Sequence, residues 1–372
     1  MPEEYRKMKT ATLTYQRHDN IGAMLQCYAL QKTIIKNGCE NEIIDYICDA
    51  ADKPFCITSL RIKGLKKYCT SIIGVISRIP KLPAFNRFRK KDLILTKKYG
   101  KSNISEIGNK YDGYIVGSDN VWNSKLTGLD KNYFLDFVKD DRRKVSYAAS
   151  MGLAEPPARE QESFAVALKK FAIVSTREEA AANNLERITG RKVFDTCDPT
   201  ILLTRDEWDK LLVEPKEFFH YVLAYHMSPS VSFVKFVKDF ARAKGLQIVY
   251  VPFPYGFCKC HMKPHIGPYE WLGYIKNADY VITDSFHGSV FCTIYERNLI
   301  MKVSQLGERL NNLANKLGIQ DRMVKTVEEA LALPPMDYTA IRGRIAAYRM
   351  QGHENIKSIL AYFQSIEDGE RK

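Results

Sequence analysis

The chain has 372 residues, of which 45% are hydrophobic and 27% are charged. This balance is ordinary for a soluble globular protein, and the length is sufficient for two domains with separate cores. Lys and Arg residues number 56 against 43 Asp and Glu residues, which gives a formal net charge of +13. The positive excess favours an anionic partner, such as a phosphorylated substrate, a membrane surface or a nucleic acid.

Several classes of protein are disfavoured by the sequence. The nine cysteines are scattered and form no CxxC pair, so neither a disulfide framework nor a zinc ribbon is indicated, and we expect a reducing, cytoplasmic setting. The first residues are charged and lack the apolar stretch of a signal peptide. No run of 18 apolar residues is present, so no membrane-spanning helix is expected.

Predicted strands and helices alternate along the chain. In the first half, strands are expected at 10–15, 42–46, 114–117, 144–149 and 172–175, with helices over 20–37, at about 157–170 and from 177. In the second half, strands are expected at 221–225, 247–252, 280–283 and 299–303, with helices over 230–244, 268–276 and from 287. This alternation predicts an α/β fold of two Rossmann-like domains with mostly parallel sheets.

The pattern is interrupted over 203–216, a charged, proline-containing stretch that we interpret as the junction between the domains. We expect an N-terminal domain over 1–210, a C-terminal domain over 211–335 and a C-terminal segment over 336–372. The last of these contains a helix at about 338–365, which is expected to pack back on the first domain.

A basic amphipathic insertion is expected over 58–100. Its residues 60–91 include ten basic residues and no acidic one, interleaved with apolar residues. This is the form of a segment that lies on an anionic membrane surface. It is equally typical of a helix packed on the core with a solvated basic face, and both interpretations stay open. Nucleic-acid binding is not expected, because no fold that binds nucleic acid accompanies the charge.

The most informative motif is D-S-F-H-G at 284–288. It follows the buried strand expected at 280–283 and opens a helix. Such a turn places backbone N–H groups and the positive end of a helix dipole at the carboxyl edge of a parallel sheet, where α/β proteins bind anions. We therefore expect a phosphorylated or carboxylated substrate here, with His287 in the turn.

Other motifs accompany this turn in a fixed order along the chain. They are N-I-G-A-M-L-Q at 20–26, G-S-D-N-V-W-N at 117–123, V-S-T-R-E at 174–178 with D-P-T at 198–200, G-P-Y-E-W-L at 267–272 before the turn, and G-E-R-L at 307–310 after it. Over about 10–320, this series resembles the polysaccharide pyruvyl transferase family. The resemblance implies a two-domain fold similar to the GT-B glycosyltransferases. It also implies transfer of pyruvate from phosphoenolpyruvate to a sugar as a ketal across two hydroxyls, in the synthesis of a capsular or other surface polysaccharide.

Phosphoenolpyruvate carries a carboxylate and a phosphate, so its site needs cations and N–H donors. The residues expected to bind it are Arg177, Ser285, His287, Gly288, Ser289 and Arg309. His287 is the expected acid that protonates the enol carbon. Many family members carry an arginine at the position of Ser285, and its loss here shifts the donor contact toward Arg309 or Lys302. The scheme requires no metal, and no cofactor besides phosphoenolpyruvate as co-substrate.

A carboxylate is needed to deprotonate the acceptor hydroxyl, and the sequence does not rank the candidates Asp119, Glu178, Glu270 and Asp284. The expected acceptor contacts are Asn20, Gly22, Ser118, Asp119 and Trp122. Structural alternatives stay open for these residues: Asn20 and Gly22 as a helix cap, Asp119 as a turn residue and Trp122 as a packing residue. His287 as a capping histidine, Arg177 as a partner of Glu178, and Asp198 as a structural turn are further alternatives.

Taken together, these observations predict a pyruvyl transferase that acts on a lipid-linked sugar, in the cytoplasm at the inner face of the cell membrane. One alternative is a nucleotide-sugar glycosyltransferase of GT-B type, because a fold does not fix a function. The other is a non-catalytic protein that binds an anionic glycan, which Ser285 in place of an arginine suggests.

Overall fold

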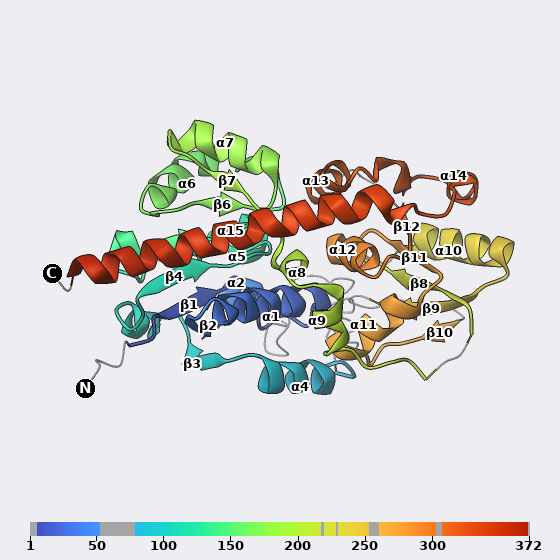
Figure 1. Ribbon diagram of the computed structural model, residues 1–372, viewed down its shortest axis with the longest axis horizontal. Coiled ribbons are helices and arrows are strands. Elements are labelled where there is room, and N and C mark those ends of the chain that lie inside the picture. Colours follow the sequence, from blue (N-terminus) through green and yellow to red (C-terminus); the bar gives the residue numbers. More distant parts are fainter. Residues whose placement is uncertain are drawn as a thin grey trace, which may run out of the picture.

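The computed structural model describes residues 6–52, 79–216, 219–227, 230–252, 260–302 and 307–370. Two parallel sheets lie side by side in it, and a long helix runs past both (Figure 1). The first sheet has the order β3-β2-β1-β4-β5 and the second has the order β10-β9-β8-β11-β12-β13. The prediction of two Rossmann-like domains with parallel sheets is confirmed.

The strands of the first sheet are β1 (Lys9–Leu13), β2 (Glu40–Tyr46), β3 (Leu95–Tyr99), β4 (Gly113–Val116) and β5 (Lys144–Ser146). Beside β5 lies a short parallel pair, β6 (Ser175–Thr176) and β7 (Phe194–Asp195), joined to the sheet through single bridges. The second sheet contains β8 (Tyr221–Tyr225), β9 (Gln247–Val251), β10 (His261–Met262), β11 (Tyr280–Thr283), β12 (Asn298–Lys302) and β13 (Met323–Val324). In each sheet the strand order reverses at the first strand, beside β4 or β11, and α/β proteins bind ligands at such points.

The α-helices around the first sheet are α1 (Ile21–Lys36), α2 (Asp49–Asp52), α4 (Leu82–Asp92), α5 (Ser124–Thr127), α6 (Gln161–Leu168) and α7 (Glu179–Thr189). Two short helices, α8 (Pro199–Leu202) and α9 (Arg205–Asp209), lead to the second sheet. There follow α10 (Val231–Lys244), α11 (Pro268–Asn277), α12 (Phe286–Ile294), α13 (Glu308–Leu317), α14 (Val327–Ala332) and α15 (Tyr338–Glu370). Single 3₁₀ turns occur at Ile104–Ile107, Lys131–Phe134, Asp141–Arg143, Ala158–Glu160 and Gln320–Arg322.

One hydrophobic cluster extends through both domains. Trp208 of α9 is fully buried, and its ring centroid lies 4.9 Å from that of Phe291 in α12 and 5.8 Å from that of Tyr28 in α1. Trp271 of α11 also packs on Phe291, with 5.4 Å between the ring centroids. The stretch 203–216, expected only to interrupt the pattern, therefore supplies a central core side chain, because a tryptophan on a short capped helix fills the space between the sheets.

Helix α15 is 33 residues long and contacts both domains (Figure 1, red). Near its start, Arg344 donates to the carbonyl of Leu317 in the second domain at 2.8 Å. In its middle, Arg349 donates to the carbonyl of Ile201 in α8 at 2.7 Å. Near its end, the ring of Phe363 packs directly against Gly113 of β4. The helix thus contacts both domains along its length and connects them.

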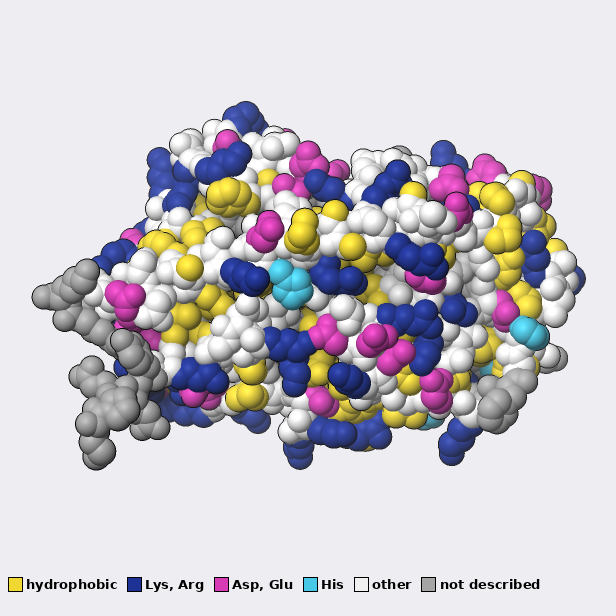
Figure 2. Space-filling view, in the orientation of Figure 1, with side chains coloured by type: hydrophobic (Ala, Val, Ile, Leu, Met, Phe, Trp, Pro, Cys, Tyr) yellow, Lys and Arg dark blue, Asp and Glu magenta, His cyan; other side chains and the backbone are white. Residues whose placement is uncertain are grey.

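Only residues 79–91 of the basic segment 60–91 are among the described residues. In α4, Phe85 and Phe88 are buried, Arg87 forms an ion pair with Glu270, and Arg89 donates to Asp19 at 2.9 Å. This part packs on the protein, as the core-packed interpretation expects, whereas the membrane interpretation of the remainder falls outside the described residues. In the part of the chain that the structure covers, no helix combines the length and apolarity needed to cross a bilayer. On the face shown in Figure 2, basic side chains are interspersed with acidic ones.

We predict that Phe363→Ala lowers the free energy of unfolding by about 3–5 kcal/mol, because the side chain is fully buried and leaves a cavity against β4. Met350→Ala is the matched control on the same helix, since Met350 is 61% exposed and its truncation should cost less than about 0.5 kcal/mol. Urea unfolding of both variants measures the difference, and equal effects would contradict the assigned packing of α15.

Candidate active site

Charged and polar side chains of both domains meet between the carboxyl ends of the two sheets. Arg177 Nη1 donates to Asp198 Oδ2 at 2.7 Å, and both residues belong to the first domain. His287, in the first turn of α12 in the second domain, has its Nε2 atom 3.6 Å from the same oxygen. We call this group the interdomain cluster, and it comprises Asp119, Arg177, Glu178, Asp198, His287 and Arg309.

Arg177 forms the centre of the cluster and is only 1% exposed. Besides Asp198, its Nε atom contacts Glu178 Oε1 at 3.1 Å, and its guanidinium lies over the ring of Phe286 at 4.4 Å. Burial alone would lower the pKa of Arg177, but Glu178 and Asp198 raise it above its ordinary value. The buried Nη2 atom has no hydrogen-bond partner in the described part of the chain. Arg177 is thus a buried partner of two carboxylates, and its expected contact with the donor stays a prediction.

Both carboxylate oxygens of Asp198 accept hydrogen bonds from neighbouring residues. Oδ1 accepts hydrogen bonds from the Thr200 amide at 3.0 Å and the Thr200 hydroxyl at 2.7 Å, which caps α8. Oδ2 accepts from Ser118 Oγ at 3.0 Å and from Arg177. Burial would raise the pKa of Asp198, but His287 and Arg177 hold it well below its usual range. The interpretation of Asp198 as a structural turn residue agrees with its role as the N-cap of α8. Its pairing with Arg177 and His287 was not predicted, because the sequence gives no signal for it.

Gly22 of the first domain packs against the ring of His287 of the second domain. A Cβ atom added to Gly22, in the first turn of α1, would overlap the His287 ring at Nδ1 and Cγ. The imidazole is 6% exposed, and its Nε2 atom has no hydrogen-bond partner in the described structure. Glycine is required at position 22 because the two helix N-termini pack this closely. Gly22 therefore packs on the histidine, which differs from its expected contact with the acceptor.

Arg309 is the second residue of α13 and is half-buried. Burial and the positive charge of Arg177 lower the pKa of Arg309, while Asp119 and Glu178 oppose this effect. Within the described ranges, no ion pair of 4.0 Å or less joins Arg309 to an acidic residue. Lys302, the other expected donor contact, directs its ammonium to the carbonyl of Lys325 and lies over the ring of Phe236, so the structure corrects that alternative.

The four candidate bases occupy different environments. Glu178 is fully buried, and its Oε1 atom accepts from Ser150 at 3.0 Å as well as from Arg177. Asp119 is 7% exposed and has a φ of 78°, as one of five non-glycine residues with positive φ in the described structure. This conformation is uncommon outside glycine, although aspartate adopts it more readily than most residues. Asp284 Oδ1 accepts from the Met227 amide at 2.7 Å, and burial raises the pKa of Asp284.

Glu270 is corrected as a candidate base. Its Oε2 atom accepts from the Gly267 amide at 3.0 Å in a capping box of α11, and its Oε1 atom forms the ion pair with Arg87 of α4. Both oxygens are therefore engaged outside the interdomain cluster. The sequence signal for this role was the proline and glutamate pattern at the start of a helix, which is typical of an N-terminal cap.

The hydroxyls of the D-S-F-H-G turn are used within α12. Ser285 Oγ accepts from the Gly288 amide at 3.3 Å, and Ser289 Oγ donates to the Ser285 carbonyl at 3.0 Å. A Cβ atom at Gly288 would lie 2.6 Å from Thr283 Oγ1 on β11, so this glycine allows the helix to pack on the strand. These three residues build the turn, whereas the sequence expected them to contact the donor.

The remaining expected acceptor contacts have structural partners. Asn20 caps α1, with its Oδ1 atom accepting from the Ala23 amide at 3.2 Å. Trp122 is 1% exposed, stacks on Phe134 at 5.7 Å and donates to the Tyr133 carbonyl at 2.9 Å. The indole is thus a packing residue, which corrects its expected contact with the acceptor.

Asn312 of α13 is a residue that the sequence did not single out. Its Nδ2 atom donates to the Arg177 carbonyl at 3.2 Å, and its Oδ1 atom accepts from the Glu179 amide at the same distance. One turn later, Lys316 pairs with Glu179 at 2.7 Å and with Asp195 at 2.9 Å. These contacts fix the second domain to the segment that carries Arg177. An amphipathic helix pattern does not reveal which of its polar residues are bridging, so no sequence signal was available.

The family model for polysaccharide pyruvyl transferase matches residues 20–301, which is most of the chain. The chain belongs to the polysaccharide pyruvyl transferase family. Gly22, Arg177, Asp198 and His287 lie within the matched range, and Arg309 lies beyond its end. A search of curated proteins gave no match.

Comparison with solved structures shows which known fold this pyruvyl transferase family member shares. It is similar to a putative UDP-N-acetylglucosamine 2-epimerase from Listeria monocytogenes, with 12% identity over 98% of this chain and 97% of that one and a TM-score of 0.55. The UDP-N-acetylglucosamine 2-epimerase from Rickettsia bellii is 11% identical over 97% and 98% of the two chains, with a TM-score of 0.50. At such identities the likeness shows the fold alone, and the expected GT-B-like arrangement is confirmed.

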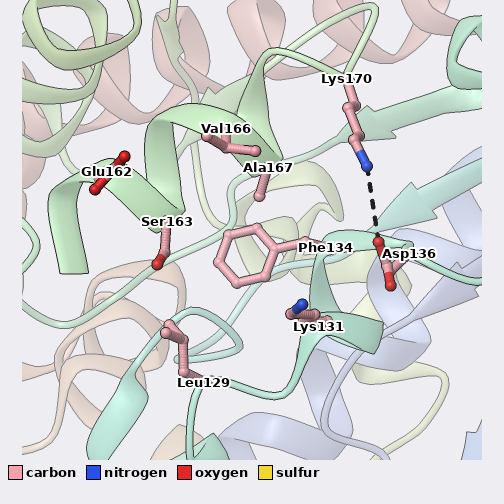
Figure 3. Close-up of a pocket in the computed structure, with 9 residues that line it drawn as sticks. All are labelled: Leu129, Lys131, Phe134, Asp136, Glu162, Ser163, Val166, Ala167 and Lys170. Atoms are coloured by element: carbon pink, nitrogen blue, oxygen red, sulfur yellow. Dashed lines mark ion pairs between the residues drawn. The ribbon is translucent and has the colours of Figure 1, made fainter.

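A separate surface hollow of about 360 Å³ lies in the first domain of this family member (Figure 3). It is formed between α6 and the segment that includes Phe134, and Lys170 pairs with Asp136 at its edge at 3.9 Å. None of its lining residues belongs to the interdomain cluster. Over the described ranges, no group of three or more His, Cys, Asp or Glu side chains is arranged to hold a metal ion.

We predict that Gly22→Ala destabilises this pyruvyl transferase family member by about 1–3 kcal/mol, because the new methyl group overlaps the His287 ring. A glycine-to-alanine change inside a helix otherwise stabilises by about 0.5–1 kcal/mol. Gly343→Ala in α15 is the control, since an added Cβ meets nothing within 4 Å there. Urea unfolding compares the two, and a stabilised Gly22→Ala variant would contradict the close approach of the domains.

Proposed function

We propose that this chain transfers pyruvate from phosphoenolpyruvate to a sugar and forms a ketal across two hydroxyls. Membership of the polysaccharide pyruvyl transferase family supports this proposal. The observation that carries it is the convergence of Arg177, Arg309 and His287 at the N-terminus of α12, because cations at a helix N-terminus suit a ligand with a phosphate and a carboxylate.

Arg309 is the proposed main cation for the donor. Arg177 already pairs with Asp198 and Glu178, whereas Arg309 is half-buried beside it and experiences its repulsion. An anion bound at Arg309 relieves that repulsion, since an opposite charge favours the charged form of a buried guanidinium. The positive end of the α12 dipole adds to the attraction.

His287 is the proposed acid. Its imidazolium gives a proton to the terminal carbon of the enol, and the substituted carbon becomes cationic and is attacked by the first sugar hydroxyl. The carbon–oxygen bond to phosphate then breaks, and the second hydroxyl attacks to complete the ketal. The two hydroxyl protons balance the one taken up by the carbon and the one that leaves with the phosphate.

Asp119 is the proposed base for the acceptor hydroxyl. Glu178 and Glu270 are engaged by arginines, and Asp284 follows β11 on the proposed donor side. Asp119 Oδ1 accepts from the Asn120 amide at 2.8 Å, much as Asp284 Oδ1 accepts from the Met227 amide, so the place of Asp119 in the first domain is what distinguishes it. Asp119 follows β4 of the first domain and has a positive φ, which is uncommon outside glycine. The acceptor is proposed to be a lipid-linked sugar at the inner face of the cell membrane, a setting in which the basic residues of 60–91 that precede residue 79 would meet anionic lipid.

We predict that purified protein releases inorganic phosphate from phosphoenolpyruvate only when a suitable glycan is present, and that mass spectrometry finds a ketal on the glycan. His287→Ala and Asp119→Asn should each lower kcat by about 100-fold or more, because each removes a proton-transfer group. Asp136→Asn, in the surface hollow, is the control and should retain activity.

Two outcomes would contradict this function. Thermal stabilisation by a nucleotide sugar but not by phosphoenolpyruvate would indicate a glycosyltransferase. Glycan binding without any donor binding would indicate a non-catalytic glycan-binding protein.

A further inference from the structure

His287 belongs to the second domain, but the first domain contacts both nitrogens of its ring. The Nδ1 side packs on Gly22 of α1, and Nε2 lies 3.6 Å from Asp198 Oδ2. Both contacts come from the first domain, across the junction of the two sheets. The orientation of the imidazole therefore depends on how the first domain is docked.

Asp198 is suited to fix that orientation because its own carboxylate is held from four directions. The Thr200 amide and hydroxyl bind Oδ1, and Ser118 and Arg177 bind Oδ2. The side chain is completely buried. A carboxylate with this many donors does not rotate freely, so it is a fixed point against which the imidazole is placed.

The docking of the first domain is itself secured next to this point. Asn312 binds the Arg177 carbonyl, and Lys316 pairs with Asp195, the residue at the end of β7 that precedes Asp198 by three positions. Through Asn312 and Lys316, the second domain thus binds the segment that carries Arg177 and Asp198, at a contact separate from His287.

We propose that Asp198 is a positioning residue for His287, and that it assembles the acid only when the two domains are docked. The role in the reaction rests on the proposed function, because His287 is the acid there. The positioning itself is a property of the fold. Asp198 does not contact the substrate and acts through the imidazole.

The first test does not require activity. Diethylpyrocarbonate labelling of each histidine is followed by mass spectrometry over a range of pH, and the plateau rate at high pH is compared, since every imidazole is neutral there. In Asp198→Asn the plateau rate at His287 should rise at least about fivefold, because the ring is released and becomes accessible. His353 lies in α15, and its Nε2 atom lies 2.9 Å from the carbonyl oxygen of Leu202 in α8. The labelling rate at His353 should not change. An unchanged rate at His287 would overturn the proposal.

Two variants separate this effect from a general loss of structure. Asp136→Asn removes a carboxylate in the surface hollow, away from the interdomain cluster and from the contacts that dock the domains, and it should leave the labelling of His287 within about twofold of wild type. Ser118→Ala removes one of the four donors to Asp198 and is expected to give an intermediate rate if Asp198→Asn does not fold. Equal acceleration by Asp136→Asn and Asp198→Asn would reject a specific role for Asp198.

The second test uses turnover of phosphoenolpyruvate with a glycan acceptor. Asp198→Asn should lower kcat by about 100-fold, the size expected for a misplaced catalytic group, while KM for phosphoenolpyruvate changes less than about threefold. A raised KM with unchanged kcat would contradict positioning. If wild-type protein has no such turnover but labelling at His287 responds as expected, the proposed reaction is wrong and the positioning stands.

Discussion

The rest of the site depends on a buried ion pair between Arg177 and Asp198. A guanidinium and a carboxylate removed from water are costly unless they are paired and most of their remaining polar atoms are bonded, and among the described residues Arg177 Nη2 is the atom of this pair that is left without a partner. This requirement accounts for Glu178, Ser118 and Thr200 around the pair, and for the aromatic face of Phe286 against the guanidinium. His287 reaches the same carboxylate from the other domain. The chemistry and the joining of the domains therefore use one set of charges.

The sequence predicted the fold class well because α/β domains have strong periodic signals. Strands at 221–225 and 280–283 were predicted with their observed bounds, and the long helix from 338 was recognised. The omitted elements include β3, β10 and β13, which are edge strands of weak hydrophobic pattern, and α9, whose sequence is mostly charged. They also include the short elements α2, α5, α8, α14 and β7, which have at most six residues each. The burial of Trp208 is a tertiary effect that no local pattern reveals.

The site was predictable only in part. The D-S-F-H-G turn, Arg177 and Arg309 were singled out because the family motifs contain them, and the structure brings them together. What sequence could not supply is which partners each residue has. Asp198 lies 89 residues from its partner His287, and Asn312 lies 135 residues from its partner Arg177. Trp122 and Glu270 differ from expectation because their partners, Tyr133 and Arg87, are also not evident from the sequence.

Helix α15 sets a mechanical limit on the molecule. A continuous helix of 33 residues is about 50 Å long and is stiff over that distance. Because it is fastened to the second domain near its start and to the first domain near its end, the domains cannot swing apart like a hinge without bending it or releasing one set of contacts. Substrates that reach the interdomain cluster must therefore enter past an almost rigid frame, and small tilts of the domains are the motion that this frame permits.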